Sequence, residues 1–208
     1  MPVHTSGAIR QKFVFRLYAR KRLCKQFGGN IDMNSVERVR NFLAQFPYNI
    51  QVIEFEESTK TAQDAARTVG VEVGQIAKTI LFVTSGGPVL VTTSGDAKVR
   101  QSNLKKHLGV TGKVKLPDAA QTLELTGFPL GGVCPFALKS PLPILIDVSM
   151  QRFPVVYIAA GSSHAVAAVT VEQLLEITGG ELCDLSRWSL KKAGIEVGSG
   201  TREPSDCV

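Results

Sequence analysis

Two periods of hydrophobic and polar residues run along this chain, one typical of helices and one typical of strands. Apolar residues recur every three or four positions across residues 34–46, which predicts a helix with Asn34 as its N-cap. Pro47 is expected to end this helix. Small apolar side chains at the same spacing predict a second helix from Thr61 to Gly70, packed close to the layer beneath it.

Apolar runs without a helical period predict the strands. A short strand is expected at residues 50–55, and the run from 74 to 83 indicates a buried central strand. The turn at 85–87 joins this run to a strand at 88–93 as a hairpin. The remaining strands are expected at 142–148, 155–161, 164–169 and 181–185. Capping residues predict helices at 103–109, 119–126 and 171–178, with Ser102, Asp118 and Thr170 as N-caps.

Hairpins and helices alternate along the chain, which predicts the α+β class with a mixed sheet. We expect one core domain over residues 33–188, because 44% of the 208 residues are hydrophobic and no second core is visible. Residues 189–208 are rich in Gly, Ser and Lys and are expected to form a flexible tail.

The net charge of +6 lies in the N-terminal part of the chain. Residues 1–32 carry seven Lys/Arg and one acid, whereas the rest carries 17 bases and 17 acids. Residues 1–32 are therefore expected to be a basic, flexible extension. Two interpretations stay open: an arm that contacts nucleic-acid phosphate, or leader sequence ahead of Met33.

Composition favours a cytoplasmic protein. No apolar run approaches the ~18 residues that span a bilayer, and the N-terminus lacks the apolar segment of a secretory signal. The cysteines show no metal-ligand spacing, so we expect free thiols in a reducing compartment. The cysteines are Cys24, Cys134, Cys183 and Cys207.

Lys78 is the unexpected polar residue of the predicted central strand. A period of two places it on the same face as Ile80 and Phe82. A buried ammonium costs several kcal/mol unless it is paired or opens to a cleft. The alternative is that Lys78 lies at the strand end and extends to water.

A glycine-proline loop lies between apolar segments at residues 131–135. Gly131 and Gly132 allow the backbone to bend, and Pro135 stiffens the loop, so its N–H groups would point in a fixed direction. An ordinary tight turn explains the same residues. Cys134 could be a nucleophile, although a cysteine in an apolar loop is more commonly a packing residue.

Two further features are candidates for ligand contact. A turn formed by Gly161, Ser162 and Ser163 presents His164 at the start of a predicted strand. Between residues 98 and 115 the chain holds bases and no acid, which suits phosphate contact, although a solvated helix face explains this pattern nearly as well. These bases are Lys98, Arg100, Lys105, Lys106, Lys113 and Lys115.

Several classes of chemistry lack a motif. Three scattered histidines offer no metal-ligand set, so we expect neither a metal nor another cofactor. Neither GxxxxGK[ST] nor GxGxxG is present, and GxSxG is also missing. What is left is a lysine, a loop of backbone donors and a histidine, which suit positioning and oxyanion stabilisation.

Three blocks in order carry a resemblance. TAQDAARTVGVEVGQIAKTILFV, GGVCPFALKSPLPILID and VYIAAGSSHAVAAVTVEQL resemble the YbaK-like aminoacyl-tRNA editing domains, freestanding relatives of the insertion domain of prolyl-tRNA synthetases. The resemblance covers roughly residues 34–187. It implies a curled mixed sheet, forming a partial barrel surrounded by helices. It also implies hydrolysis of the ester in a tRNA mischarged with a small amino acid of the Ala, Ser or Cys class.

The resemblance also implies roles for particular residues. Lys78 matches the family's functional lysine, and the loop from Gly131 through Gly132, Val133 and Cys134 to Pro135 matches its GxxxP loop, which would hold the aminoacyl carbonyl. Thr79 lies where some alanine-specific relatives carry asparagine, which places alanine specificity in question. The second loop at the pocket mouth matches Gly161, Ser162 and His164.

The resemblance also implies a metal-independent mechanism, in which a ribose hydroxyl of the tRNA helps to activate water. The implied partners are the acceptor end of tRNA, through the basic residues at 98–113, and an aminoacyl-tRNA synthetase. Two other functions stay open. One is a non-catalytic module that binds tRNA or a synthetase, and the other is a hydrolase of small acyl esters unrelated to RNA.

Overall fold

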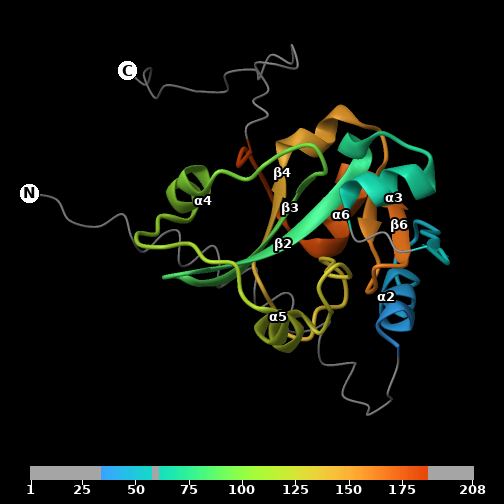
Figure 1. The fold of residues 1–208 in the computed structure, drawn as a ribbon, viewed down its shortest axis with the longest axis horizontal. Helices are drawn as coiled ribbons and strands as arrows, with labels where there is room; N and C mark the ends of the chain where they lie inside the picture. The colour runs from blue at the N-terminus through green and yellow to red at the C-terminus, as the bar shows by residue number, and fades with distance from the viewer. Residues whose placement is uncertain (1–33, 58–60, 187–208) are drawn as a thin grey trace, which may run out of the picture.

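The computed structural model describes residues 34–57 and 61–186. The extension predicted over residues 1–32 and the tail predicted over 189–208 lie outside the described residues. Within them, the chain forms a seven-stranded mixed sheet packed with helices, which confirms the predicted α+β class (Figure 1).

The strands lie in the order β1-β6-β5-β2-β3-β4-β7. Their bounds are β1 (Val52–Glu54), β2 (Ile76–Thr84), β3 (Gly87–Ser94), β4 (Ile144–Asp147), β5 (Val156–Ala159), β6 (Ala165–Val169) and β7 (Glu181–Cys183). The predicted β2–β3 hairpin is confirmed, with Thr84 opposite Gly87 at its turn. The pairs β2·β5, β3·β4 and β4·β7 are parallel, and the others are antiparallel. The curl of the sheet into a partial barrel stays a prediction.

The helices begin largely where the capping residues predict. They are α2 (Ser35–Leu43), α3 (Ala62–Val69), α4 (Gln101–Leu108), α5 (Ala119–Thr126) and α6 (Val171–Thr178), with short 3₁₀ segments η2 (Val73–Gln75) and η3 (Val148–Arg152). The side chains of Asn34, Thr61, Asp118 and Thr170 accept backbone N–H bonds as N-caps. The prediction for Ser102 is wrong. Ser102 lies inside α4, because the backbone N–H of Arg100 is held by Leu185 O at 2.7 Å and the helix begins directly after it.

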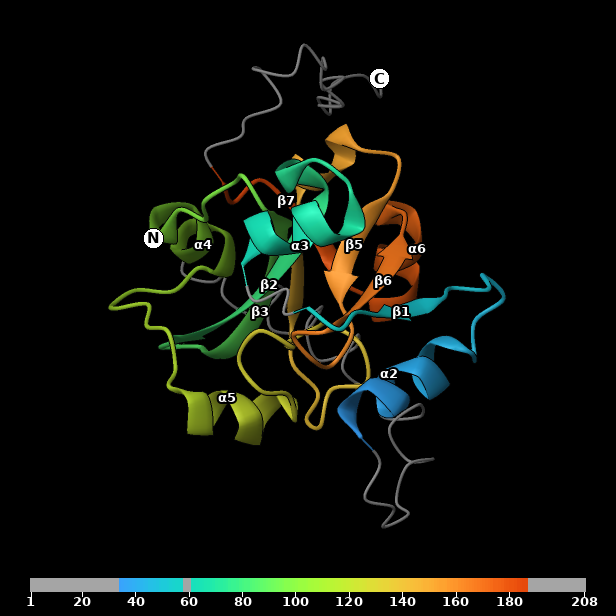
Figure 2. The same cartoon turned by 45° about the vertical axis from the view of Figure 1, so that its right-hand side comes forward.

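α2 and α5 both lie at one end of the sheet, below the strands in the view of Figure 2. The main core lies between the sheet, α2 and α6, and includes Val39, Leu90, Phe136, Ile146 and Leu174, all fully buried. A smaller cluster around Leu104 of α4 packs against the other face of β3 and β4. The alanines of α3 pack on Ile76 of β2, as their small size predicts.

The pairing of β2 changes along its length. β2 pairs with β5 only at Ile76 and Ala77, while the hairpin with β3 continues to Thr84. Further along, Val83 exchanges two backbone hydrogen bonds with Lys115, at 2.9 and 3.0 Å. Because backbone groups alternate sides along a strand, those of Thr79 and Leu81 also point away from β3. No described strand lies opposite them, so the sheet opens at this point.

Candidate functional site

A pocket of about 440 Å³ fills this opening between β2 and β5. That volume lies in the range of small-molecule sites, about 300–1,000 Å³. Strand, helix and loop residues all contribute to its wall. Among the described residues, the wall is formed by Thr61, Ala62, Ala65, Ile76, Ala77, Lys78, Thr79, Ile80, Leu81, Leu116, Pro117, Thr122, Leu130, Gly131, Val133, Tyr157, Ala159 and Val166.

Lys78 stands in the pocket wall as a partly desolvated cation. Its Nζ donates to the carbonyl oxygen of Ala97 at 3.1 Å. Burial lowers the pKa of Lys78, and the nearby carboxylate of Asp96 acts in the opposite direction. Of the two readings of this lysine, the structure therefore favours a cleft over simple extension to water from a strand end.

The turn that accepts the Lys78 hydrogen bond is itself held in place. Arg152 of η3 binds both carboxylate oxygens of Asp96, at 2.6 and 3.0 Å, and its guanidinium carbon lies 4.8 Å from the centre of the Phe153 ring. A Cβ at Gly95 would lie 2.2 Å from the carbonyl oxygen of Val73, so this turn packs directly on η2. These contacts fix the carbonyl to which the Lys78 ammonium is bound.

The glycine-proline loop reaches the same pocket through part of its length. Gly131 and Val133 line the wall, and Gly131 has a φ of +89°, which glycine adopts without strain. The Gly132 N–H donates to Pro129 O at 3.0 Å, so this amide is already used inside the loop. The N–H groups of Gly131, Val133 and Cys134 have no acceptor within the described part of the chain.

Gly132 instead forms a close backbone contact with the second predicted loop. A Cβ at Gly132 would lie 2.7 Å from the carbonyl group of Gly161. Gly161 packs in turn on α2, where its carbonyl oxygen accepts a hydrogen bond from Ser35 Oγ at 2.8 Å. The two glycines are therefore needed for the approach of the two loops, and neither belongs to the pocket wall.

Cys134 and Pro135 lie in the interior, outside the set that lines the pocket. The Cys134 side chain is fully buried, and its thiol faces the carbonyl oxygen of Phe136 at 3.7 Å. Burial raises the pKa of Cys134 to about 12, so its thiol is protonated at neutral pH. Of the two interpretations, this placement supports a packing residue.

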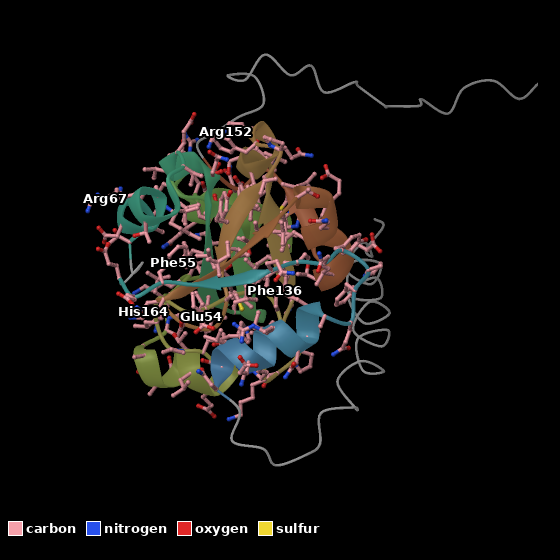
Figure 3. The ribbon with its side chains drawn as sticks, turned by 90° about the vertical axis from the view of Figure 1, so that its right-hand side faces the viewer. Glu54, Phe55, Arg67, Phe136, Arg152 and His164 are labelled. Carbon is pink, nitrogen blue, oxygen red and sulfur yellow. The ribbon has the colours of Figure 1, made fainter. Side chains whose placement is uncertain are left out.

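His164 and Ser162 also lie outside the pocket wall. His164 is exposed beside Glu54 and Phe55 (Figure 3), and its carbonyl oxygen accepts the N–H of Phe55 at 2.7 Å. Ser162 Oγ accepts the His164 N–H at 3.1 Å and stabilises the turn. β6 begins at Ala165, one residue after the predicted start.

The predicted basic residues lie between positions 98 and 113, outside the pocket wall. Lys105 and Lys106 belong to the last turn of α4, and Lys113 is exposed in the loop that follows. Lys98 and Arg100 are exposed on either side of Val99, whose backbone forms an isolated bridge with Ser186. None of these five residues lines the pocket.

The sequence reasoning did not find several residues of the pocket wall. Leu116 and Leu130 lie in loops, and Tyr157 comes from the far side of the opening, on β5. The small side chains of α3 were a usable signal, since Ala62 and Ala65 let this helix approach the pocket. No periodic pattern marks loop leucines as wall residues.

The described residues offer neither a metal-ligand cluster nor a membrane-spanning helix. Residues 34–57 and 61–186 contain no group of three or more His, Cys, Asp or Glu side chains that could hold a metal ion. Among the helices of this part of the chain, none is long and apolar enough to cross a membrane.

The fold and the pocket define an aminoacyl-tRNA editing domain. Residues 56–177 match the model of the family described as "Aminoacyl-tRNA editing domain", so the chain belongs to this family. Its members include YbaK-like domains related to the editing domain of prolyl-tRNA synthetase.

Three relatives illustrate the match. YwhH of Bacillus subtilis, an uncharacterised protein, is 35% identical over 145 residues, which cover 69% of this chain and 91% of YwhH. EbsC of Enterococcus faecalis, named as a candidate Cys-tRNA(Pro)/Cys-tRNA(Cys) deacylase, is 25% identical over 67% of this chain and 85% of EbsC. The crystal structure of a candidate trans-editing enzyme for prolyl tRNA synthetase superposes with a TM-score of 0.69 at 34% identity, covering 75% of this chain and 99% of the other.

Proposed function

We propose that this protein is a trans-editing deacylase that hydrolyses the ester of a tRNA mischarged with a small amino acid. One observation carries the proposal: Lys78 and the loop residues Gly131 and Val133 line one pocket, although they lie more than 50 positions apart in the chain. The membership in the editing family supplies the substrate class. The acceptor end of tRNA is then the partner, and a cytoplasmic location follows from the role in translation.

The proposed reaction is an acyl transfer to water. A water oxygen attacks the ester carbonyl carbon, and the carbonyl oxygen becomes an oxyanion near the N–H groups of Gly131 and Val133, which have no acceptor among the described residues. The ribose hydroxyl next to the ester accepts the hydrogen bond of the attacking water and orients it. The bond between the carbonyl carbon and the ribose oxygen then breaks, a proton moves to that oxygen, and a free amino acid and tRNA are released.

Lys78 has a positioning and electrostatic role in this proposal. Its ammonium, held by Ala97 O, stands in the pocket wall, where a low dielectric strengthens its attraction for ribose and ester oxygens. Thr79 follows it in the wall, and its hydroxyl shares a 3.3 Å hydrogen bond with that of Thr92. An activated ester needs orientation and charge stabilisation more than it needs a protein nucleophile.

Selection of a small acyl group would come from the apolar part of the wall. Leu81, Ala159 and Val166 contribute short or branched side chains to the pocket wall. One methylene changes binding by only ~1–3 kcal/mol, so exclusion of larger acyl groups requires contact with rigid neighbours. Leu81 and Val166 are buried in the sheet and are rigid in this sense.

A deacylation panel tests the proposal. tRNAs charged with Ala, Ser, Cys and Pro are incubated with the purified full-length protein, with and without EDTA. We expect release of at least one small amino acid at a rate that EDTA does not change and that Lys78→Ala abolishes. Arg67→Ala, an exposed site on α3 outside the pocket wall, is the control. Loss of activity in EDTA together with an active Lys78→Ala variant would contradict the mechanism.

A non-catalytic module that binds tRNA or a synthetase is the second candidate. The exposed cations of α4 and the following loop favour it, because they would bind RNA without any chemistry in the pocket. Binding of tRNA without turnover of any member of the panel would support this candidate over the deacylase.

A further inference from the structure

Arg38 of α2 belongs neither to the pocket wall nor to the predicted basic residues. Its Nη2 donates to the carbonyl oxygen of Gly127 at 2.7 Å, and its guanidinium carbon lies 4.4 Å from the centre of the Phe128 ring. Gly127 is the C-cap of α5, and Phe128 is fully buried. The guanidinium therefore binds the first two residues that follow α5.

The chain that follows α5 forms a loop whose two ends lie together. The Lys139 N–H donates to Thr126 O at 3.0 Å, so the residue before the loop binds its last residue. We call residues 127–139 the pocket loop, because Gly131 and Val133, which line the pocket, belong to it. Compact loops with closed ends are held largely by contacts at and within them. The guanidinium acts at the point where this loop closes.

The fit around the guanidinium is close. A Cβ at Gly127 would lie 2.9 Å from Arg38 Nη2 and 3.0 Å from the Cβ of Lys139. The charge of Arg38 also acts on the middle of the loop, where it opposes the burial that raises the pKa of the Cys134 thiol. The guanidinium thus interacts with the start and with the middle of the pocket loop.

Stability alone does not account for a charged side chain at this place. Burial lowers the pKa of Arg38, because the surroundings disfavour its charge. Its Nε is buried and makes no hydrogen bond within residues 34–57 and 61–186. An unpaired buried donor destabilises the folded state, and an apolar side chain of similar length would avoid both effects. The cation is nevertheless present where it binds the pocket loop.

α2 supports both loops of the site from one face of the helix. Ser35, whose hydroxyl binds Gly161 O, lies three positions before Arg38, and residues three apart share a helix face. α2 and α5 lie at the same end of the sheet (Figure 2), so this face meets the chain that leaves α5. Ser35 therefore holds one loop, and Arg38 holds the other.

We propose that Arg38 is a positioning residue, whose guanidinium holds the pocket loop so that the N–H groups of Gly131 and Val133 meet the oxyanion. The inference rests on the proposed function. Oxyanion donors act at about 2.7–3.1 Å, and a misplacement of about 1 Å can lower a rate about 100-fold. Because the oxyanion exists only in the transition state, loss of Arg38 lowers the rate constant and leaves substrate binding nearly unchanged.

The test compares Arg38→Met with Arg40→Met in the full-length protein. Methionine has a long, unbranched side chain that packs well on an aromatic ring, so we expect both variants to fold. Arg40 is the matched control, because it lies on the same helix and binds Glu37 and Glu54 instead of the pocket loop.

Single-turnover hydrolysis at saturating protein gives the rate constant for the most reactive mischarged tRNA of the panel, and titration of uncharged tRNA gives the affinity. We expect Arg38→Met to lower the rate constant at least about tenfold and to keep the affinity within about threefold. Arg40→Met should change neither quantity.

Amide hydrogen exchange provides a second measurement, which does not depend on activity. Exchange in residues 127–139 should be at least about tenfold faster in Arg38→Met than in the wild type, because a hydrogen bond from a charged donor is lost. Exchange in the same residues of Arg40→Met should equal that of the wild type.

A folded Arg38→Met variant with the rate constant of the wild type, or with exchange no faster than in Arg40→Met, would overturn the proposal. So would weaker tRNA binding with a smaller salt slope and an unchanged rate constant, since that result would assign Arg38 to phosphate contact. Faster exchange in a protein that hydrolyses no member of the panel would contradict the proposed function and retain Arg38 as the residue that holds the loop. Hydrolysis with unchanged exchange would do the reverse.

Discussion

At the scale of single residues, the partly buried position of Lys78 lowers the free energy of unfolding at neutral pH. Burial lowers its pKa, so the folded protein holds this proton less tightly than the unfolded chain does. The unfolded state then binds more protons between the lowered pKa and the ordinary value of 10.5, and the free energy of unfolding rises with pH across that window. At neutral pH the charged side chain costs stability that only a function in the pocket would offset.

Lys78→Met should therefore be inactive without being less stable. Methionine has a similar length and removes the charge from the wall, so we expect an unchanged or higher melting temperature at pH 7. The rise in unfolding free energy towards pH 10.5 should be smaller than in the wild type. Chemical denaturation at several pH values measures both. A melting temperature several degrees lower would contradict this account of the site.

Cys134 should be dispensable for hydrolysis. Its thiol is fully buried, with a pKa of about 12, so it is neither ionised nor open to the pocket. We expect Cys134→Ala to keep a deacylation rate within about threefold of the wild type, and to lose about 1 kcal/mol of stability from the smaller side chain. Activity that disappears in a folded Cys134→Ala variant would instead assign the thiol to the chemistry.

At the scale of elements, the contact between two loops supports part of the pocket wall. The Gly131–Pro135 loop and the loop that begins at Gly161 meet through backbone alone, and α2 supports the second loop through Ser35. The contact leaves no room for a side chain. Any Cβ at this point has to displace the loop that carries Gly131 and Val133 to the pocket.

Gly132→Ala should damage the site through this contact. Its Cβ would lie 2.7 Å from the Gly161 backbone, so we expect a loss of about 1–3 kcal/mol in unfolding free energy. Deacylation should fall with it. Gly86→Ala is the control: the nearest atom there is the end of the Val110 side chain at 3.0 Å, which can move. Equal stability of the two variants in denaturation would show that the loops do not need this approach.

The elements could be predicted from sequence where their causes are local. Asn34, Thr61, Asp118 and Thr170 cap helices because the capping bond joins residues two or three positions apart. The pocket could not be predicted in the same way. It depends on the short β2–β5 pairing, which joins Ala77 to Ile158 and then ends. No local pattern reports where such a pairing stops.

The same limit applies to the site residues. The resemblance brought Lys78 and the 131–135 loop together, and both reach the pocket, yet it could not separate wall residues from packing residues. Gly131 and Val133 line the wall, while Gly132 and Cys134 are used for packing. That division follows from the direction in which each residue of the loop points, which depends on tertiary contacts.

At the scale of the whole molecule, charge should guide RNA to the pocket. α4, which carries the exposed Lys106, lies on the other side of β2 and β3 from α3 (Figure 1), and the loop that follows α4 carries the exposed Lys113 and Lys115. The extension at residues 1–32, outside the described residues, adds six net positive charges to the chain.

Salt dependence measures these contributions. Lys106→Ala and Lys113→Ala should each weaken tRNA binding for every tRNA and reduce the slope of log affinity against log salt by about 1. Arg67→Ala, at a site that is also exposed but lies on α3, should leave the slope unchanged. A smaller slope after deletion of residues 1–32 would identify a functional arm. Unchanged slopes in both lysine variants would place the RNA elsewhere on the molecule.

The most direct test of the central claim is single-turnover hydrolysis of one mischarged tRNA by the wild type and by Lys78→Ala at equal, saturating protein concentration. The account predicts a rate constant that falls at least about 100-fold in the variant, as on loss of an electrostatic stabiliser, while tRNA affinity changes by less than about threefold because phosphate contacts dominate it. A Lys78→Ala rate equal to that of the wild type would contradict it, since the pocket at β2 would then not be the place where the ester is cleaved.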